Sequence, residues 1–201
     1  MIKTIIFDIG GVVTDTDFEA IHSSFATKIG ISPDVIINYV NEKKDDLLLG
    51  NISFEQFWKE MKDAGGTSNT DYKALWIAEG IKHREVNKGL LGVIEKLRKH
   101  YLVGALTNLT ESRFILDEQM DLYSHFDYAV LSYEEHLKKP DFAFYNIALS
   151  RASAKPEEAI FIDDKEKCTI PAEQLGMKSI LYKYPDNDAL IYNLHQLGVS
   201  L

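Results

Sequence analysis

The stretch TIIFDIGG, residues 4–11, places a short apolar run directly before an aspartate and two glycines. The run TIIF is rich in β-branched and aromatic residues, as buried strands are. Four later runs share this character, at residues 102–106, 128–131, 159–162 and 179–182. Helical patterns separate or follow them, at residues 86–100, 142–151, 169–175 and 188–197. This alternation predicts an α/β fold with a parallel sheet built from βαβ units.

Residues 16–85 break the alternation, because they contain helical patterns and no convincing strand. The helical patterns lie near residues 18–29, 33–43, 54–63 and 71–79. We predict that residues 16–85 form an inserted helical cap over the carboxyl edge of the sheet. Residues 1–15 and 86–201 then form the core domain. The alternative is that these helices merely pack against the sheet.

The composition is that of a globular chain that does not bind nucleic acid. Of 201 residues, 22 are Lys or Arg and 31 are Asp or Glu, so the formal net charge is −9, and no nucleic acid polymer is expected as a partner. The single cysteine, Cys168, excludes an internal disulfide and suits a reducing compartment. We expect a cytoplasmic monomer or homodimer without a membrane partner, since no long apolar segment or signal-peptide pattern is present.

Polar residues follow four of the expected strands. They are Asp8 and Gly10 after the first, Thr107 and Asn108 after the second, Lys139 beyond the third, and Asp163 and Asp164 after the fourth. In an open parallel sheet, ligands bind beyond the carboxyl ends of the strands. We therefore expect these groups to converge on one crevice.

Such a group of side chains supports phosphoryl transfer. Asp8 and Asp164 repel each other unless a cation lies between them or one is protonated, and an all-oxygen site suits Mg²⁺ better than Zn²⁺. Thr107 and Asn108 can donate hydrogen bonds to a phosphoryl oxygen, and Lys139 can neutralise the charge gained during transfer. The Asp8 carboxylate can attack phosphorus and form an aspartyl-phosphate that water hydrolyses.

Four motifs in this order resemble those of the haloacid dehalogenase-like hydrolases: FDIGGVV at 7–13, LTN at 106–108, KPD at 139–141 and FIDD at 161–164. The resemblance spans essentially the whole chain and points to the branch with small helical caps, which is similar to sugar-phosphate phosphatases. It implies a Rossmann-like, doubly wound core with an inserted cap. It also implies the site roles: Asp8 as nucleophile and Mg²⁺ ligand, Lys139 as a catalytic electrostatic clamp that also contacts phosphate, Thr107 and Asn108 as phosphate-binding residues, Asp164 and the Gly10 backbone carbonyl as metal ligands, and Asp163 as acidic support.

The sequence departs from this pattern at two positions. Most phosphatases that it resembles carry a second aspartate where Gly10 stands here, and losing a general acid or base typically costs about 10²- to 10⁴-fold in rate. Cys168 stands where the family often has Asp or Asn, and a thiol is a poor partner for a hard cation. The histidines show no ligand spacing, so none is expected in the site.

Three functions remain open from the sequence. The first is a Mg²⁺-dependent phosphatase that hydrolyses a small phosphorylated metabolite, such as a sugar phosphate, through an aspartyl-phosphate. The second is a catalytically weak regulatory protein that binds phosphate and metal but turns over slowly because of Gly10. The third is a haloacid dehalogenase, which would need no metal.

Overall fold

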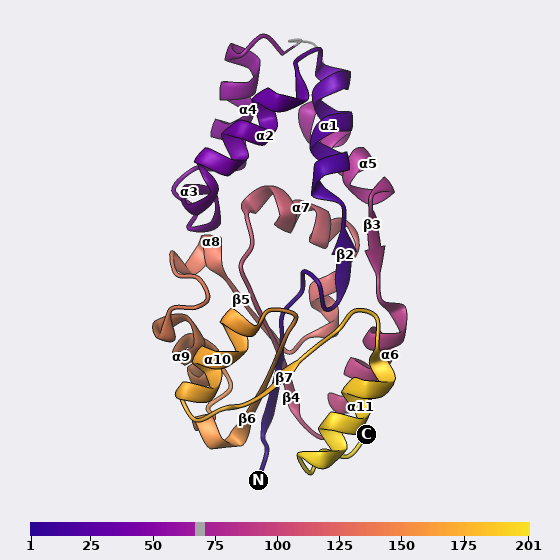
Figure 1. Cartoon of the computed structure of the whole chain (residues 1–201), viewed down its shortest axis with the longest axis vertical. Coiled ribbons are helices and arrows are strands. Elements are labelled where there is room, and N and C mark those ends of the chain that lie inside the picture. The colour runs from indigo at the N-terminus through magenta and orange to yellow at the C-terminus, as the bar shows by residue number, and fades with distance from the viewer. Residues whose placement is uncertain (67–70) are drawn as a thin grey trace.

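The computed structural model describes residues 1–66 and 71–201, and its centre is a parallel sheet (Figure 1). The sheet order is β5-β4-β1-β6-β7. The strands are β1 (Thr4–Phe7), β4 (Leu102–Thr107), β5 (Tyr128–Leu131), β6 (Ala159–Asp163) and β7 (Lys178–Leu181). β1 pairs on one side with β4 and on the other with β6, with Thr4 opposite Leu102 and Ala159. The predicted α/β fold with a Rossmann-like parallel sheet is confirmed.

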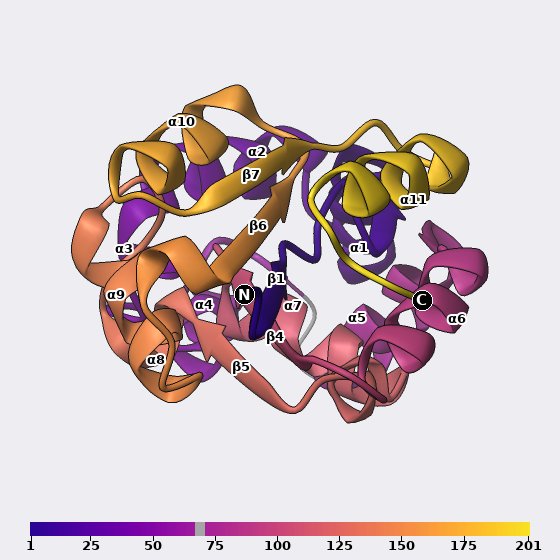
Figure 2. The ribbon, with the colours of Figure 1, turned by 90° about the horizontal axis from the view of Figure 1, so that it is seen from below.

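Helices cover both faces of this sheet, as Figure 2 shows. One face carries α6 (Lys88–Leu97) and α11 (Asn187–Gln196), and the other carries α9 (Phe142–Arg151) and α10 (Glu166–Gln174). Successive side chains of β1 alternate between the two layers: Ile5 and Phe7 lie in the cluster that includes α6 and α11, and Ile6 in the cluster of α9 and α10. Because β1 is buried on both faces, its carboxyl end is held firmly beneath the functional groups that follow it.

Within residues 17–66 and 71–83, the structure describes five helices between two short strands, and they form the upper part of the molecule in Figure 1. They are α1 (Phe18–Ile29), α2 (Pro33–Glu42), α3 (Lys44–Leu48), α4 (Phe54–Asp63) and α5 (Tyr72–Lys82). Aromatic side chains fill their shared core, where Trp58 packs against Phe25 at a ring-centroid distance of 4.7 Å and against Trp76 at 5.9 Å. Residues 67–70 of the expected insertion lie outside the described residues.

The expectation of no strand in residues 16–85 was wrong at both ends of that segment. β2 (Thr14–Thr16) and β3 (Arg84–Val86) pair in antiparallel fashion, so the expected boundaries at 15/16 and 85/86 divide these strands. Three-residue strands of mostly polar sequence carry too few residues for a period of two to be recognised. The pair forms the double connection between the sheet and the five helices.

The sequence also failed to indicate α7 (Glu111–Gln119), which follows β4. Its Ile115 and Leu116 are buried in the aromatic core of α1, α4 and α5. α7 thus joins the sheet layer to the upper helices, and its apolar face is too short to give a clear helical period. The remaining short helices are α8 (Ser132–Glu135) and the 3₁₀ turns η1 (Leu122–His125) and η2 (Pro156–Glu158).

Helix starts follow ordinary capping chemistry, since several helices begin after a side chain whose oxygen accepts a backbone N–H of the first turn. These caps are Asp17, Ser53, Asp71, Asn87, Thr110, Asp141 and Asp186. In the described part of the chain, no helix combines the length and the apolar character needed to cross a bilayer.

Candidate active site

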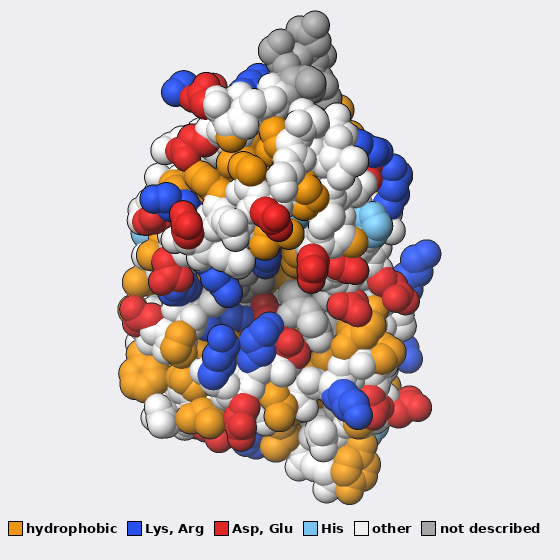
Figure 3. Space-filling model, turned by 45° about the horizontal axis from the view of Figure 1, so that its top comes forward, with side chains coloured by type: hydrophobic (Ala, Val, Ile, Leu, Met, Phe, Trp, Pro, Cys, Tyr) orange, Lys and Arg blue, Asp and Glu red, His pale blue; other side chains and the backbone are white. Residues whose placement is uncertain are grey.

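The four strand-end motifs meet at one edge of the sheet, in a cavity of about 890 Å³. Asp8 follows β1, Thr107 ends β4, Asp163 ends β6, and Lys139 lies in the loop between α8 and α9. Residues of α1, α2 and α3 line the cavity from the opposite side. Figure 3 shows a hollow on this face with Lys and Arg side chains gathered beside it.

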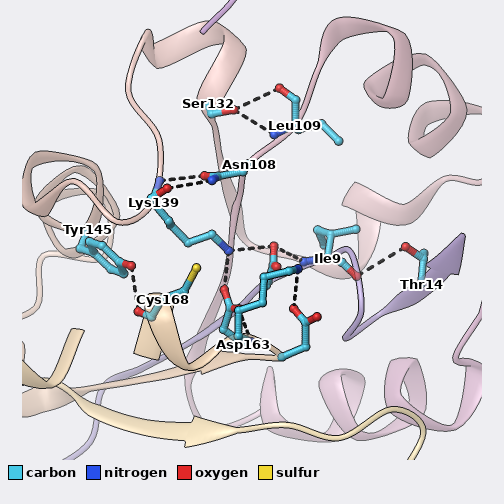
Figure 4. Close-up of polar contacts among 12 residues, drawn as sticks. Ile9, Thr14, Asn108, Leu109, Ser132, Lys139, Tyr145, Asp163 and Cys168 are labelled. Atoms are coloured by element: carbon cyan, nitrogen blue, oxygen red, sulfur yellow. Dashed lines mark hydrogen bonds and ion pairs between the residues drawn. The ribbon is translucent and has the colours of Figure 1, made fainter. Parts of the chain in front are cut away.

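Lys139 forms the centre of the site, as Figure 4 shows. Its Nζ lies 2.9 Å from Asp8 Oδ1 and 2.6 Å from Asp163 Oδ2. All three residues are buried, with exposed fractions of 4% for Lys139, 5% for Asp8 and 0% for Asp163. Burial opposes the charged form of Lys139, but the two carboxylates raise its pKa well above the ordinary value. The ammonium group is therefore a permanent positive charge between two acids.

Asp8 presents one occupied and one available carboxylate oxygen. Oδ1 forms the ion pair with Lys139 and accepts a hydrogen bond from the backbone N–H of Ile9 at 2.8 Å. Oδ2 has no partner among the described residues. Burial raises the pKa of Asp8 above its ordinary value, and Lys139 opposes that rise. A carboxylate fixed through one oxygen and free at the other is arranged to act as a ligand or a nucleophile through the free atom.

A cluster of acids stands at the same edge and offers only oxygen donors. Carboxylate oxygens of Asp8, Asp163 and Asp164 lie within 4.8 Å of one another. Asp163 is already engaged at both oxygens, by Lys139 and by the backbone N–H of Lys165 at 2.8 Å, so it orients its neighbours. Asp164 Oδ1 accepts the Lys165 ammonium at 3.0 Å. The donors left are Asp8 Oδ2, Asp164 Oδ2 and the Gly10 carbonyl, which accepts no hydrogen bond within the described residues. This set of hard oxygen donors fits Mg²⁺.

Gly10 and Gly11 differ in the space that surrounds them for a side chain. At Gly11 the backbone has a φ of +83°, and a Cβ there would lie 2.4 Å from Asp164 Oδ2. At Gly10 a Cβ would meet no atom of the described residues within 4 Å. Gly11 therefore holds the loop against Asp164, whereas the space beside Gly10 can admit a side chain.

Thr107 and Asn108 lie at the edge as expected but differ in their freedom. The Thr107 side chain lines the cavity, and its hydroxyl has no partner in the described part of the chain. The Asn108 amide is engaged with the backbone of Lys139: its Oδ1 accepts the Lys139 N–H at 2.8 Å, and its Nδ2 donates to the Lys139 carbonyl at 2.9 Å. Asn108 thus fixes the position of Lys139 and keeps one amide hydrogen for another acceptor.

Several cavity residues were not indicated by the sequence. Arg84 from β3 and Arg113 from α7 line the cavity wall. No motif signals these two arginines, because each reaches the cavity from a segment remote in sequence. Lys138, which stands directly before Lys139, forms an ion pair with Asp45 of α3 that joins the two halves of the molecule.

His22 also lines the cavity, although no histidine was expected there. Its ring stacks on Trp76 at a centroid distance of 5.7 Å. Burial, and next the positive charge of Arg113, lower the pKa of His22 to about 4. The ring is therefore neutral at physiological pH and adds no charge to the cavity.

Cys168 lies at the floor of the cavity, near Lys139. Its backbone carbonyl accepts the Tyr145 hydroxyl at 2.8 Å, and burial raises the pKa of its thiol to about 11. A buried, protonated thiol packs but supplies no ligand for a hard cation, as the sequence led us to expect.

Comparison with known proteins agrees with this geometry. A family model described as haloacid dehalogenase-like hydrolase matches residues 2–174. The chain belongs to this family. It is thus a hydrolase, and the resemblance noted in its four motifs is confirmed.

Two curated relatives of the chain are named as phosphatases. One, the D-ribitol-5-phosphate phosphatase of Bacteroides thetaiotaomicron, is 27% identical over 94% of each chain. The other, the glyceraldehyde 3-phosphate phosphatase of Pyrococcus furiosus, is 28% identical over 57% of this chain and 52% of its own length. The chain also matches the rat bifunctional epoxide hydrolase 2 at 24% identity but spans only 36% of that protein.

Solved structures share the whole fold. A haloacid dehalogenase family enzyme of Bacteroides thetaiotaomicron, solved with magnesium and inorganic phosphate, matches with a TM-score of 0.77 at 23% identity. The match covers 96% of this chain and all of that one. A predicted hydrolase of the family from Porphyromonas gingivalis gives a TM-score of 0.77 at 25% identity, with both chains fully covered.

Proposed function

We propose that the protein is a Mg²⁺-dependent phosphatase that hydrolyses a small phosphorylated metabolite, such as a sugar or polyol phosphate. The observation that carries this proposal is the buried Lys139 ammonium between Asp8 and Asp163, with Asp8 on the cavity lining and its Oδ2 without a partner among the described residues. The names of two relatives, both phosphatases of small sugar-related phosphates, support the same substrate class.

The reaction proceeds in two steps on Asp8. Its free Oδ2 attacks the phosphorus of the substrate, the bond from phosphorus to the ester oxygen breaks, and the ester oxygen takes a proton from a water molecule and leaves as the alcohol. The hydroxide left by that water then attacks the phosphorus of the aspartyl-phosphate, the bond from phosphorus to Asp8 breaks, and the products are hydrogen phosphate and the restored carboxylate. Lys139 lies where it neutralises charge that develops on the transferred group, and Thr107 offers its hydroxyl to a phosphoryl oxygen.

Asp8, Asp164 and the Gly10 carbonyl would hold the Mg²⁺ ion. When bound, the ion supplies positive charge that offsets the repulsion between carboxylates and phosphate. The thiol of Cys168 contributes nothing to this set, so we propose a modest affinity for the ion.

We propose that residues 16–85 act as the cap for this site. Residues from α1, α2 and α3 already face the cavity, and the ion pair from Lys138 to Asp45 joins the loop that carries Lys139 to α3. A cap in this position excludes bulk water when closed and releases product when open.

The rival function, a weakly catalytic regulatory protein, is favoured by one observation. Gly10 leaves the position of the usual proton donor without a carboxyl group, although the space beside it is open. A protein that binds metal and phosphate at this site but lacks an acid would turn over slowly.

The experiment that tests the proposal measures phosphate release from a panel of phosphorylated metabolites with Mg²⁺ and with EDTA. We expect release with Mg²⁺ that is lost with EDTA and in Asp8→Asn, while the far-ultraviolet circular dichroism of Asp8→Asn stays native. Release by Asp8→Asn at the wild-type rate would overturn the nucleophile assignment.

Gly10→Asp separates the two functions, with Gly10→Asn as the control of equal size. If the missing acid limits the rate, Gly10→Asp should release phosphate about 10²- to 10⁴-fold faster, and Gly10→Asn should not. An enzyme adapted to Gly10 should gain nothing from either variant. The regulatory function would be favoured if the wild-type protein released no phosphate from any compound of the panel and Gly10→Asp did release it.

A further inference from the structure

Two arginines stand together on the cavity wall away from Lys139, and neither belongs to the family motifs. Arg84 comes from β3 and Arg113 from the first turn of α7, and both line the cavity. The Arg84 side chain is buried, with an exposed fraction of 3%. The guanidinium carbon of Arg113 lies 3.6 Å from the centroid of the Phe18 ring, so the group stacks on α1.

The guanidinium groups of Arg84 and Arg113 have fewer hydrogen-bond acceptors around them than N–H donors. Arg84 forms an ion pair with Asp117 of α7 and donates from Nη2 to Thr14 Oγ1 at 3.1 Å, but its Nε and Nη1 are buried and have no partner in the part of the chain that the structure describes. The guanidinium of Arg113 donates no hydrogen bond within the described residues. One carboxylate therefore faces two guanidinium groups, and Asp117 also accepts the Tyr123 hydroxyl at 2.7 Å.

Both arginines keep their charge in this setting. Burial, and next the charge of Arg84, lower the pKa of Arg113 to about 10, so the group stays protonated at neutral pH. Among the described residues, seven Lys or Arg and five Asp or Glu line the cavity, so basic residues outnumber acidic ones there although the chain carries a net charge of −9. Arg113 lines the cavity, its guanidinium has no acceptor among the described residues, and a planar guanidinium matches the two oxygens of a carboxylate or phosphate. The arrangement favours an acceptor supplied by a ligand.

We propose that the substrate carries a second anionic group, a carboxylate or a second phosphate, and that Arg113 binds it. This inference rests on the proposed phosphatase function and narrows its substrate class. Stacking on Phe18 fixes the plane of the Arg113 guanidinium, and the charge of Arg84 behind it adds to the attraction. The phosphoryl group lies at Asp8 and Lys139, and the second anion lies at the arginine wall.

The test compares three five-carbon substrates that share the same phosphorylated end. D-ribitol 5-phosphate is neutral at its far end, D-ribonate 5-phosphate carries a carboxylate there, and D-ribose 1,5-bisphosphate carries a phosphate. We expect kcat/KM for at least one doubly anionic substrate to exceed that for ribitol 5-phosphate by about 10- to 100-fold. Whichever of the two is preferred identifies the second group.

Arg113→Met, which keeps an apolar side chain against Phe18, should reduce that ratio at least tenfold, mainly through KM. Arg113→Lys should recover part of it, because the charge returns without the planar fork. The control is Arg151→Met, which removes an arginine of α9 outside the cavity and should leave the ratio unchanged. Circular dichroism of each variant serves as the check that it is folded.

Two outcomes overturn the proposal while the phosphatase function stands. One is a wild-type protein that shows no preference for a second anion. The other is an equal loss on all three substrates in Arg113→Met, which would assign Arg113 to the transferred phosphoryl group.

If the protein releases phosphate from none of these compounds, the proposed phosphatase function fails. Binding measurements then decide whether Arg113 recognises a second anionic group. Calorimetric titration of the same three compounds into Asp8→Asn and into Asp8→Asn/Arg113→Met then measures the preference directly. Tighter binding of a doubly anionic compound that disappears with Arg113 supports the proposal, and equal affinities refute it.

Discussion

Gly11→Ala should disable the site while Gly10→Ala, one residue earlier, should not. The Cβ at position 11 would lie 2.4 Å from Asp164 Oδ2 and 2.6 Å from its Cγ. An ordinary contact begins near 3.4 Å, so the Asp164 carboxylate must move by about 1 Å, and a misplacement of that size in an active site can cost about 100-fold in rate. At position 10 a Cβ has no neighbour within 4 Å in residues 1–66 and 71–201.

The backbone adds a second penalty at Gly11. A φ of +83° lies in the left-handed region, which costs an alanine about 1–2 kcal/mol relative to its preferred conformations. We therefore expect the free energy of unfolding of Gly11→Ala to fall by about 1–2 kcal/mol. For a chain of this length that lowers the melting temperature by about 2–8 °C.

The assay combines urea unfolding with phosphate release as a function of Mg²⁺ concentration. Gly11→Ala should remain folded at 20 °C, release phosphate about 100-fold more slowly, and need more Mg²⁺ for half-maximal rate. Gly10→Ala should stay within a few-fold of the wild-type rate with unchanged Mg²⁺ dependence. Wild-type activity and Mg²⁺ dependence in Gly11→Ala would refute the contact between Gly11 and Asp164.

Three further predictions concern ion pairs and hydrogen bonds that stabilise the site and the proposed cap. Lys139→Met leaves two carboxylates buried without a counter-ion, so its free energy of unfolding in EDTA at pH 8 should drop by about 3–5 kcal/mol; a urea midpoint equal to that of the wild type would contradict this reasoning. Asn108→Ala frees the Lys139 backbone and should lower kcat by about tenfold or more without weakening inhibition by inorganic phosphate, whereas weaker inhibition would show that Asn108 binds the phosphoryl group directly. Burial opposes ionisation of Glu79, but hydrogen bonds from Lys28 and Lys82 lower its pKa from 4.5 to about 2. The contribution of the Glu79 carboxylate to the free energy of unfolding should therefore be complete above pH 4.5 and diminish as the pH falls toward 2. Glu79→Gln should lack this pH dependence, and parallel profiles of unfolding free energy against pH for the two proteins would exclude this role.

The sequence was sufficient for the sheet and for the identity of the acids. Strand β1 (Thr4–Phe7) and helix α9 (Phe142–Arg151) have the predicted bounds, because a buried strand and an amphipathic helix each impose a pattern that needs no knowledge of partners. The position of Asp8 after β1 followed from the same pattern, since parallel strands present their carboxyl ends at one edge.

The short elements and the individual contacts depended on tertiary structure. β2 and β3 lie 70 residues apart, with Thr14 opposite Val86, and neither has a pattern of its own. The free oxygen of Asp8, the engagement of Asn108 by Lys139, and the pairing of Arg84 with α7 each depend on how distant segments meet.

Sequence alone therefore determined which chemical groups stand at the sheet edge, because chain order and strand direction place them there. Only the tertiary structure decided which atoms of those groups are free and what faces them. The physical reason is that a hydrogen bond or ion pair forms within a few tenths of an ångström, and that accuracy arises from packing between segments, not from any local pattern along the chain.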